Sequence, residues 1–285
     1  MYPIWAYGSE DQKQKYLPGM SAGQIIGCFG LTEPDHGSNP SGMLTNAVKT
    51  DTGYRLNGTK RWITNGTIAD IAIVWAKLDD KIRGFIVPTD SRGFTAQDIH
   101  GKWSLRASVT SELIMEDCEV SSDALLPEVA GLRGPLGCLN QARFGIAFGA
   151  VGTMLACYDE SLSYAGDRVQ FSRPIAGYQL VQEKLATMVT EITKAQLLSL
   201  QLGRLKEAGT MRPQQVSLAK RNNVYWAREI SRMGRDILGA NGVTNDYQCG
   251  RHMLNIESVY TYEGTHDIHT LVLGQDVTGI SAFGQ

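Results

Sequence analysis

The densest group of titratable side chains lies near the C-terminus, in the stretch Tyr262–His269 (YEGTHDIH). Glu263 precedes Gly264 and Thr265, and threonine is a favoured helix N-cap, so Glu263 is expected in a connection between two helices. A carboxylate in such a connection can face a cleft and be partly desolvated, which raises its pKa toward that of a useful general base. The alternative interpretation is compensation of a helix dipole, and Asp267 in the first turn fits it well.

Two histidines follow this carboxylate. His266 and His269 are three residues apart and share one helix face, so a metal pair must be considered. The ligand set is incomplete, because no further Cys or His lies nearby in the sequence and Asp267 points elsewhere on the helix. We therefore predict no metal site.

Three other segments have residue types that suit ligand binding. Leu31–Ser38 has hydroxyls and loop N–H groups for a polar ligand, or forms ordinary turns at a strand end. Trp62 can lie against a planar cofactor or fill a small core. The glycines of Ile237–Gly242 permit close approach to a pyrophosphate, although a helix C-cap followed by a turn is the stronger interpretation of that stretch alone.

The elements that must position these residues change character along the chain. Between about 24 and 126 the signals are those of strands, and Asn57-Gly58 is expected to form a tight hairpin turn. Short turn-bounded strands predict a compact barrel or sandwich. Two apolar runs, Ile71–Ala76 and Phe85–Val87, are expected to be buried strands, and Glu112–Met115 is expected to be a further strand. Ahead of them, Ser9 and Gln12 fit a capping box that starts a short helix ending at Pro18.

From about residue 137 onward the pattern is helical. Apolar residues from Val181 to Leu205 recur at spacings of three and four, which predicts a helix of about 30 residues, typical of a bundle. Further helices are expected at about 139–166, 213–238, 246–257 and 266–280. The predicted fold class is α+β (mixed), with a middle β-barrel or sandwich domain followed by a C-terminal four-helix bundle.

Composition excludes several classes of protein. The 285 residues have a formal net charge of −2 and no basic block, which argues against a nucleic-acid partner. No apolar run approaches the ~18 residues of a membrane span, and the first residues do not resemble a signal peptide. Five widely spaced cysteines indicate neither a disulfide framework nor a zinc site. We expect a reducing compartment: the bacterial cytoplasm, or the mitochondrial matrix if the source is eukaryotic.

Seven stretches have a residue order that is more specific than the composition and periodicity described above. They are Cys28–Pro34, Leu56–Asn65, Lys102–Ser108, Gly137–Ala147, Asp167–Phe171, Tyr178–Leu180 and Thr261–His269. In these stretches the sequence resembles the acyl-CoA dehydrogenase family, most closely its glutaryl-CoA branch. The resemblance implies an N-terminal helical domain, a middle β domain and a C-terminal bundle. It places a remnant of the first domain at 1–23, the middle domain at 24–126 and the bundle at 127–285.

The resemblance also implies an activity. The family oxidises the Cα–Cβ bond of an acyl-CoA with FAD, and the branch points to glutaryl-CoA, with decarboxylation to crotonyl-CoA. Glu263 takes the place of the base that removes the Cα proton, and its N–H that of a donor to the thioester oxygen. Expected partners are the acyl-CoA substrate, electron-transfer flavoprotein and further copies in a homotetramer or dimer. The alternatives are an impaired family member that acts as a scaffold subunit and, more distantly, a metal-dependent hydrolase.

The resemblance carries over further residues. The expected FAD contacts are Phe29, Leu31, Thr32, Ser38, Trp62, Ile63, Thr64, Arg168, Phe171, Gln179, Asp236, Gly239, Ala240 and Thr265. Of these, Arg168, Phe171 and Gln179 correspond to contacts that in the family reach a neighbouring subunit. The expected acyl-CoA contacts are Ser38, Asn140, Arg143 and Gly264.

Overall fold

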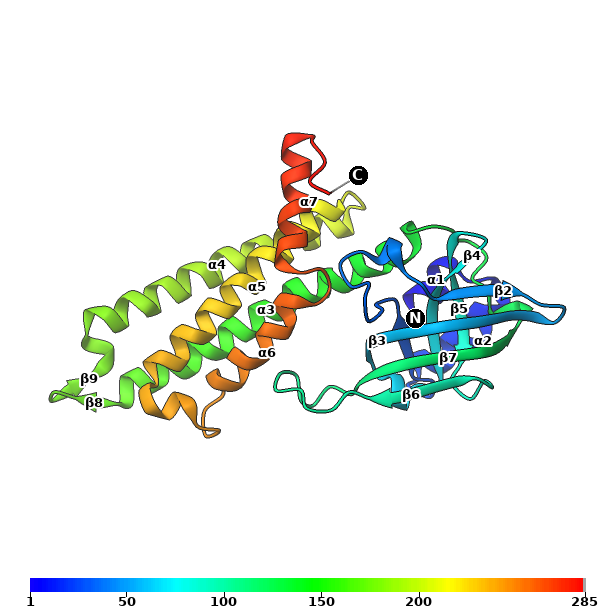
Figure 1. Ribbon diagram of the computed structural model, residues 1–285. Helices are drawn as coiled ribbons and strands as arrows, with labels where there is room; N and C mark the ends of the chain where they lie inside the picture. Colours follow the sequence, from blue (N-terminus) through cyan, green and yellow to red (C-terminus); the bar gives the residue numbers. More distant parts are fainter. Residues whose placement is uncertain (284–285) are drawn as a thin grey trace. The chain divides into compact units, whose positions relative to one another are not determined.

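The computed structural model describes residues 1–283, which divide into two compact units (Figure 1). The first, here called the β unit, contains residues 1–102 and 106–139. The second, the helical unit, contains residues 103–105 and the chain from residue 140 onward. A β unit followed by helices confirms the predicted α+β class. The family-domain boundaries at residues 23 and 126 stay a prediction, because compactness does not define where a family domain begins.

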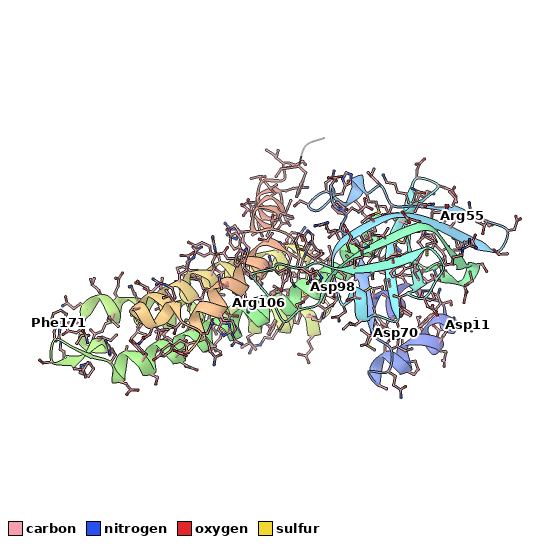
Figure 2. The ribbon with its side chains drawn as sticks, turned by 60° about the horizontal axis from the view of Figure 1, so that its bottom comes forward. Asp11, Arg55, Asp70, Asp98, Arg106 and Phe171 are labelled. Atoms are coloured by element: carbon pink, nitrogen blue, oxygen red, sulfur yellow. The ribbon has the colours of Figure 1, made fainter. Side chains whose placement is uncertain are left out.

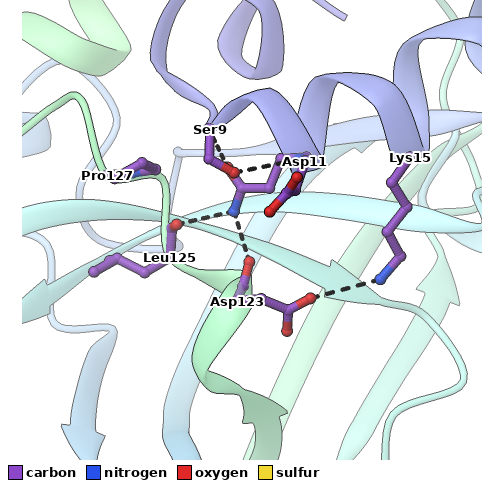
Figure 3. Close-up of a pocket in the computed structure, with 7 residues that line it drawn as sticks. Ser9, Asp11, Lys15, Asp123, Leu125 and Pro127 are labelled. Atoms are coloured by element: carbon purple, nitrogen blue, oxygen red, sulfur yellow. Dashed lines mark hydrogen bonds and ion pairs between the residues drawn. The ribbon is translucent and has the colours of Figure 1, made fainter.

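The β unit opens with two short helices, α1 (Tyr2–Tyr7) and α2 (Glu10–Ser21). The predicted capping box is present, because Ser9 and Gln12 each bond the other's backbone N–H. The side-chain amide of Gln12 also donates to the carbonyls of Asp123 and Leu125. These three residues are among those that line a pocket of about 240 Å³ (Figure 3). The hydrogen bonds of Gln12 thus anchor α2 to the segment 123–125. The prediction that Pro18 ends the helix is wrong, since α2 continues to Ser21 and Pro18 lies inside it, at the cost of the one intrahelical bond that its missing N–H would make.

A curled, half-barrel sheet of seven strands forms the rest of the β unit, in the order β1-β4-β2-β3-β7-β6 with β5 paired to β4. Its strands are β1 (Gly27–Gly30), β2 (Asn46–Lys49), β3 (Gly53–Thr64), β4 (Ile71–Leu78), β5 (Lys81–Pro88), β6 (Phe94–Asp98) and β7 (Thr110–Ser121). Strand β4 is buried over Ile71–Ala76, because one face packs in the core around Phe85 and the other in the core around Trp75. The predicted run Ile71–Ala76 is therefore a central strand, whereas Phe85–Val87 lies on β5, which pairs with β4.

The predicted hairpin turn at Asn57-Gly58 is wrong. Strand β3 runs through both residues, and the register against β7 shifts between Leu56 and Gly58, as at a β-bulge. Gly58 has φ 141° and lies so close to Thr45 that a Cβ would come within 2.5 Å of that side chain. The glycine is thus required by a close approach of neighbouring backbone, and the actual turn between β2 and β3 precedes Gly53.

The helical unit is a bundle with a large apolar core and a smaller apolar cluster around Leu202 and Val216. Helices α3 (Arg133–Asp167), α4 (Gln179–Glu207), α5 (Pro213–Ile237), α6 (Cys249–Thr261) and α7 (His266–Thr278) lie close to the predicted ranges, and α3 begins within the β unit. The stripe predicted for α4 is buried at Leu185, Met188 and Ile192. A small hairpin, β8 (Val169–Gln170) with β9 (Arg173–Pro174), connects α3 to α4. Short 3-10 turns occupy Pro40–Gly42, Gly66–Ile68, Ser122–Ala124, Ile175–Gly177 and Gly239–Val243.

Two general properties complete the description. All five cysteines lie within the described residues, where they are buried and unpaired. None of the helices in residues 1–283 combines the length and the apolar character that crossing a membrane requires.

Candidate functional site

Glu263 lies in the four-residue connection between α6 and α7, as the sequence predicts. Its φ of 53° is left-handed, and Gly264 follows with φ 83°. Thr265 is the N-cap of α7, and its hydroxyl accepts a 3.1 Å hydrogen bond from the amide of Ile268. A non-glycine residue rarely adopts a left-handed conformation unless its surroundings hold it there. The contacts of this loop therefore decide where the Glu263 side chain points.

The backbone carbonyls of the loop are held by side chains from three helices. Arg143 on α3 donates from Nε to the carbonyl of Glu263 at 2.8 Å, and His269 Nε2 on α7 lies 3.1 Å from the same oxygen. Lys220 on α5 donates to the carbonyls of Tyr262 at 3.0 Å and Gly264 at 2.8 Å. Three successive carbonyls thus face one cluster of N–H donors.

The carboxylate of Glu263, unlike its backbone carbonyl, has an oxygen without a hydrogen bond to any described residue. Its Oε2 atom is buried and has no hydrogen-bond partner among residues 1–283. Burial raises the pKa of Glu263, while the positive charges of Arg143 and Lys220 act in the opposite direction. An unpaired carboxylate oxygen in a desolvated site is suited to accept a proton.

The Glu263 amide complements this carboxylate. While its carbonyl is bonded twice, its N–H finds no acceptor in the described part of the chain. A backbone N–H of this kind can donate to an oxygen that becomes negatively charged during a reaction. The loop thus offers a base and a donor on one residue.

The two histidines make separate contacts. His266 stacks on the ring of Tyr260, with centroids 4.6 Å apart and an interplanar angle of 8°. His269 is fully buried, and burial lowers its pKa to about 3. A neutral His269 can place its single proton on Nε2 and donate it to the Glu263 carbonyl. This assigns His269 to the loop's support, a role that the metal-pair interpretation did not foresee.

In the β unit, the first two predicted flavin segments lie side by side. The amide of Arg61 donates to the carbonyl of Thr32 at 2.8 Å. The next residue, Trp62, has φ 63° and a side chain that is 55% exposed, beside the partly exposed Thr32. An exposed indole beside a hydroxyl fits a planar cofactor with polar edges. Leu31 and Ile63 are buried in the core, so their side chains are unavailable to a ligand; Phe29 is half-buried, and Ser38 and Thr64 are exposed.

A buried ion pair holds the first of these segments. Lys60 Nζ lies 2.8 Å from Glu33 Oε1 and donates to the carbonyl of Leu31 at 3.1 Å. The Glu33 carboxylate also accepts from the amides of Leu44 at 2.6 Å and Thr45 at 2.9 Å. The residues on both sides of Thr32 are therefore fixed by one ionic network.

The other predicted cofactor residues gather elsewhere in the helical unit. Arg168, Phe171 and Gln179 belong to the β8–β9 hairpin and the start of α4, at the end of the bundle opposite α7 (Figure 1). Figure 2 shows Phe171 at the tip of this hairpin, and its side chain is 91% exposed. Asp236 forms an ion pair with Lys184 near the start of α4. Gly239 and Ala240 follow on an exposed turn. Within one chain, these residues do not join Glu263.

The predicted acyl-CoA contacts are also distributed over both units. Gly264 and Arg143 lie at the Glu263 loop, and a Cβ on Gly264 would come within 3.3 Å of Arg143 Nη2. Asn140 is one helical turn before Arg143 on α3, whereas Ser38 lies on an exposed loop of the β unit. The sequence interpretation missed Lys220 altogether. The sequence does contain a sign of its burial, because Lys220 lies on the same face of α5 as the apolar residues Val216 and Val224.

Comparison with known proteins gives the context of this geometry. The middle domain of acyl-CoA dehydrogenases matches residues 28–118, and the C-terminal domain of the same family matches residues 130–278. A short-chain specific acyl-CoA dehydrogenase of Megasphaera elsdenii is 35% identical over 279 residues, which cover 95% of this chain and 73% of the relative. The crystal structure of glutaryl-CoA dehydrogenase from Mycobacterium smegmatis superposes with a TM-score of 0.98 at 55% identity, covering 99% of this chain and 73% of that one. A second structure of glutaryl-CoA dehydrogenase from that organism, in complex with FADH2, has a TM-score of 0.98 at 53% identity, with the same coverage.

Proposed function

Because this chain belongs to the acyl-CoA dehydrogenase family, we propose that it oxidises the Cα–Cβ bond of an acyl-CoA thioester, with glutaryl-CoA as substrate and FAD as cofactor. The 55% identity to a glutaryl-CoA dehydrogenase supports this substrate over the short-chain specificity of the relative that is 35% identical. The FADH2 complex of a neighbour supports the cofactor.

The observation that carries the proposal is the unpaired Oε2 of Glu263. A proton on the carbon next to a thioester is weakly acidic, so its removal needs a base of raised pKa and a donor to the oxygen that becomes enolate-like. Glu263 provides both, because burial raises the pKa of its carboxyl group and its N–H has no acceptor in residues 1–283. FAD, when bound, accepts the hydride that leaves Cβ.

The chain has residues that fit FAD. In the β unit, Thr32 and Ser38 supply hydroxyls, and Trp62 supplies an exposed aromatic face. Phe29, Leu31, Ile63 and Thr64 belong to the same two segments, and the buried Leu31 and Ile63 can contribute through their backbone only. In the helical unit, Thr265 directly follows the Glu263-Gly264 pair. We propose that Ser38, Asn140, Arg143 and Gly264 lie near the acyl-CoA.

We further propose that the protein functions as a homotetramer or dimer and passes electrons to electron-transfer flavoprotein. Arg168, Phe171 and Gln179 lie at the opposite end of the bundle from Glu263, so a cofactor contact through them suits the FAD of another copy. The exposure of Phe171 suits burial between subunits. Light scattering of the purified protein tests this, and a monomer that retains FAD would contradict it.

A visible spectrum of the purified protein tests the proposed function. We expect a flavin absorbance band that bleaches when glutaryl-CoA is added without an electron acceptor, and bleaches more slowly with a straight-chain acyl-CoA. Product analysis then distinguishes crotonyl-CoA with carbon dioxide from an unsaturated dicarboxylic thioester. A colourless protein that neither binds added FAD nor responds to glutaryl-CoA would contradict the proposal and favour the scaffold alternative.

A further inference from the structure

Lys220 is a buried lysine in an unusual setting. It is 1% exposed, yet no carboxylate within residues 1–283 forms a salt bridge with it. Burying an ammonium group without an ionic partner is costly, and a methionine of similar length would fill the same space without that cost. The hydrogen bonds of Lys220 therefore indicate what the side chain is there to do.

Both of those bonds go to the loop that carries Glu263. Lys220 Nζ donates to the carbonyl of the preceding residue, Tyr262, and to that of the following residue, Gly264. The two contacts enclose the left-handed Glu263 from both sides. The Tyr262 carbonyl belongs to the peptide plane before Glu263, and the Gly264 carbonyl belongs to the plane after Gly264. One amine bound to both restrains the backbone of the loop on either side of Glu263, and the course of this backbone sets the direction of the Glu263 side chain.

We propose that Lys220 is a positioning residue for Glu263, which by bridging the carbonyls of Tyr262 and Gly264 holds the base in its left-handed conformation and adds a positive charge beside its carboxylate. This inference rests on the proposed role of Glu263 as the base. Lys220 itself does not touch the reacting atoms; its action passes through the loop backbone and through charge.

The bridge does not depend on the charge of the lysine. Burial and, to a smaller extent, the Arg143 guanidinium lower the pKa of Lys220 to about 7, although the Glu263 carboxylate acts in the opposite direction. A neutral amine retains two N–H groups, which are enough for both carbonyls. The loop is therefore held on either side of neutral pH, while the electrostatic support for the Glu263 carboxylate declines as Lys220 loses its proton.

The groups that face Glu263 are few and come from each neighbouring element. Arg143 projects from α3 and Lys220 from α5, while His266 and His269 belong to α7. Burial lowers the pKa of both histidines, that of His269 to about 3. Tyr262 precedes the base, and burial raises the pKa of its hydroxyl. Arg143 and Lys220 are thus the cations whose charge lowers the pKa of Glu263.

The test uses three variants of the full chain. Lys220→Met removes both N–H donors at similar length. Lys220→Gln keeps an amide NH₂ but is one atom shorter and uncharged, so it cannot reach both carbonyls equally well. Lys49→Met makes the same change at an exposed lysine of β2, and it serves as the control. Circular dichroism and the unfolding midpoint establish that each variant folds.

The first measurement needs neither substrate nor turnover. Hydrogen–deuterium exchange followed by mass spectrometry reports the local opening of the peptide that contains residues 259–268. We expect exchange of this peptide to be fastest in Lys220→Met, intermediate in Lys220→Gln and unchanged in Lys49→Met. If Lys220→Met does not fold, faster exchange in Lys220→Gln alone supports the inference. Wild-type exchange in whichever of these two variants folds would overturn it.

The second measurement is the rate of flavin reduction by glutaryl-CoA in proteins that retain FAD. We expect Lys220→Met to slow reduction about 100-fold, as for a base misplaced by about an ångström, with little change in KM. Loss of the positive charge also moves the acid limb of the pH profile to higher pH, a change that loss of packing alone does not produce. A wild-type protein that fails to bleach would reject the proposed function, while the exchange experiment would still test whether Lys220 holds the loop.

Discussion

Arg143 donates its 2.8 Å hydrogen bond to the main-chain carbonyl of Glu263 and not to its carboxylate. The guanidinium thus holds the backbone of the loop while Oε2 of the same residue stays without a partner within residues 1–283. A bidentate ion pair would instead have stabilised the carboxylate and lowered its basicity. We therefore propose that Arg143 supports the proposed base, in addition to the acyl-CoA contact that the sequence resemblance implies.

The environment of Glu263 predicts how activity depends on pH. Burial raises the pKa of Glu263 above its ordinary value of 4.5, against the opposing charges of Arg143 and Lys220. The base must be unprotonated to accept a proton, so kcat/KM should rise with pH, with an acid limb whose midpoint exceeds that value. Stopped-flow flavin reduction across the pH range of the folded protein measures this limb. A midpoint at or below the ordinary value would contradict a desolvated base.

Gly264→Ala should damage the loop without unfolding the protein. Gly264 has φ 83°, and an added Cβ would lie 2.8 Å from His269 Nε2 and 3.0 Å from its Cε1. An alanine costs about 1–2 kcal/mol in a left-handed conformation, and the contact pushes His269 away from the Glu263 carbonyl. We expect slower flavin reduction and a lower unfolding midpoint.

Gly145→Ala is the matched control for this variant. Gly145 lies on α3 with no neighbour within 4 Å of an added Cβ. Alanine in a helix is more stable than glycine by about 0.5–1 kcal/mol, so this variant should retain activity and unfold no earlier than the wild type. Equal effects of the two substitutions would show that the Gly264 loop needs no special conformation.

Lys60→Met should destabilise the β unit. Lys60 is fully buried beside Glu33, and its removal leaves a buried carboxylate without its cation. Breaking a buried ion pair on one side typically costs about 3–5 kcal/mol. Urea unfolding followed by tryptophan fluorescence measures the change, and FAD retention should fall with it because the Leu31–Glu33 segment loosens. The exposed Lys49→Met on β2 is the control, with an expected effect within about 0.5 kcal/mol.

The same pair predicts acid sensitivity. Burial alone would raise the pKa of Glu33, but the Leu44 amide and Lys60 more than reverse this and lower it to about 2. A carboxyl whose pKa is lower in the folded state stabilises the fold above its unfolded value and loses that contribution as the pH falls toward the folded one. The wild type should therefore lose stability between about pH 4.5 and 2, and Lys60→Met should lose less. Identical acid unfolding of both proteins would remove the pair from this role.

The helices could be predicted because their apolar spacing records the packing directly. The stripe through Leu185, Met188 and Ile192 faces the bundle core, and each connection between helices contains at least one glycine. Residue spacing could not show that Asn57-Gly58 lies inside a strand and not in a turn. A glycine in a strand can serve a turn or a close approach, and only the neighbouring Thr45 shows that Gly58 serves the second.

Some residues of the candidate site could be predicted from the sequence, and others could not. Glu263 could be located because the sequence places it between a helix end and an N-cap. The pairing of Lys60 with Glu33 joins residues from separate strand regions, which periodicity does not connect. Lys220 was overlooked because lysine is normally exposed, although its position on the buried face of α5 is visible once that face is marked. Such a conflict between residue type and position is a useful signal of function.

The most direct test of the central claim compares Glu263→Gln with the wild type and with Asp267→Asn, which changes an exposed carboxylate in the first turn of α7. All three proteins should purify with bound flavin. Upon anaerobic addition of glutaryl-CoA, the flavin band should bleach in the wild type and in Asp267→Asn but persist in Glu263→Gln. Bleaching of Glu263→Gln at the wild-type rate would show that another group removes the proton, and would contradict the assignment of Glu263 as the base.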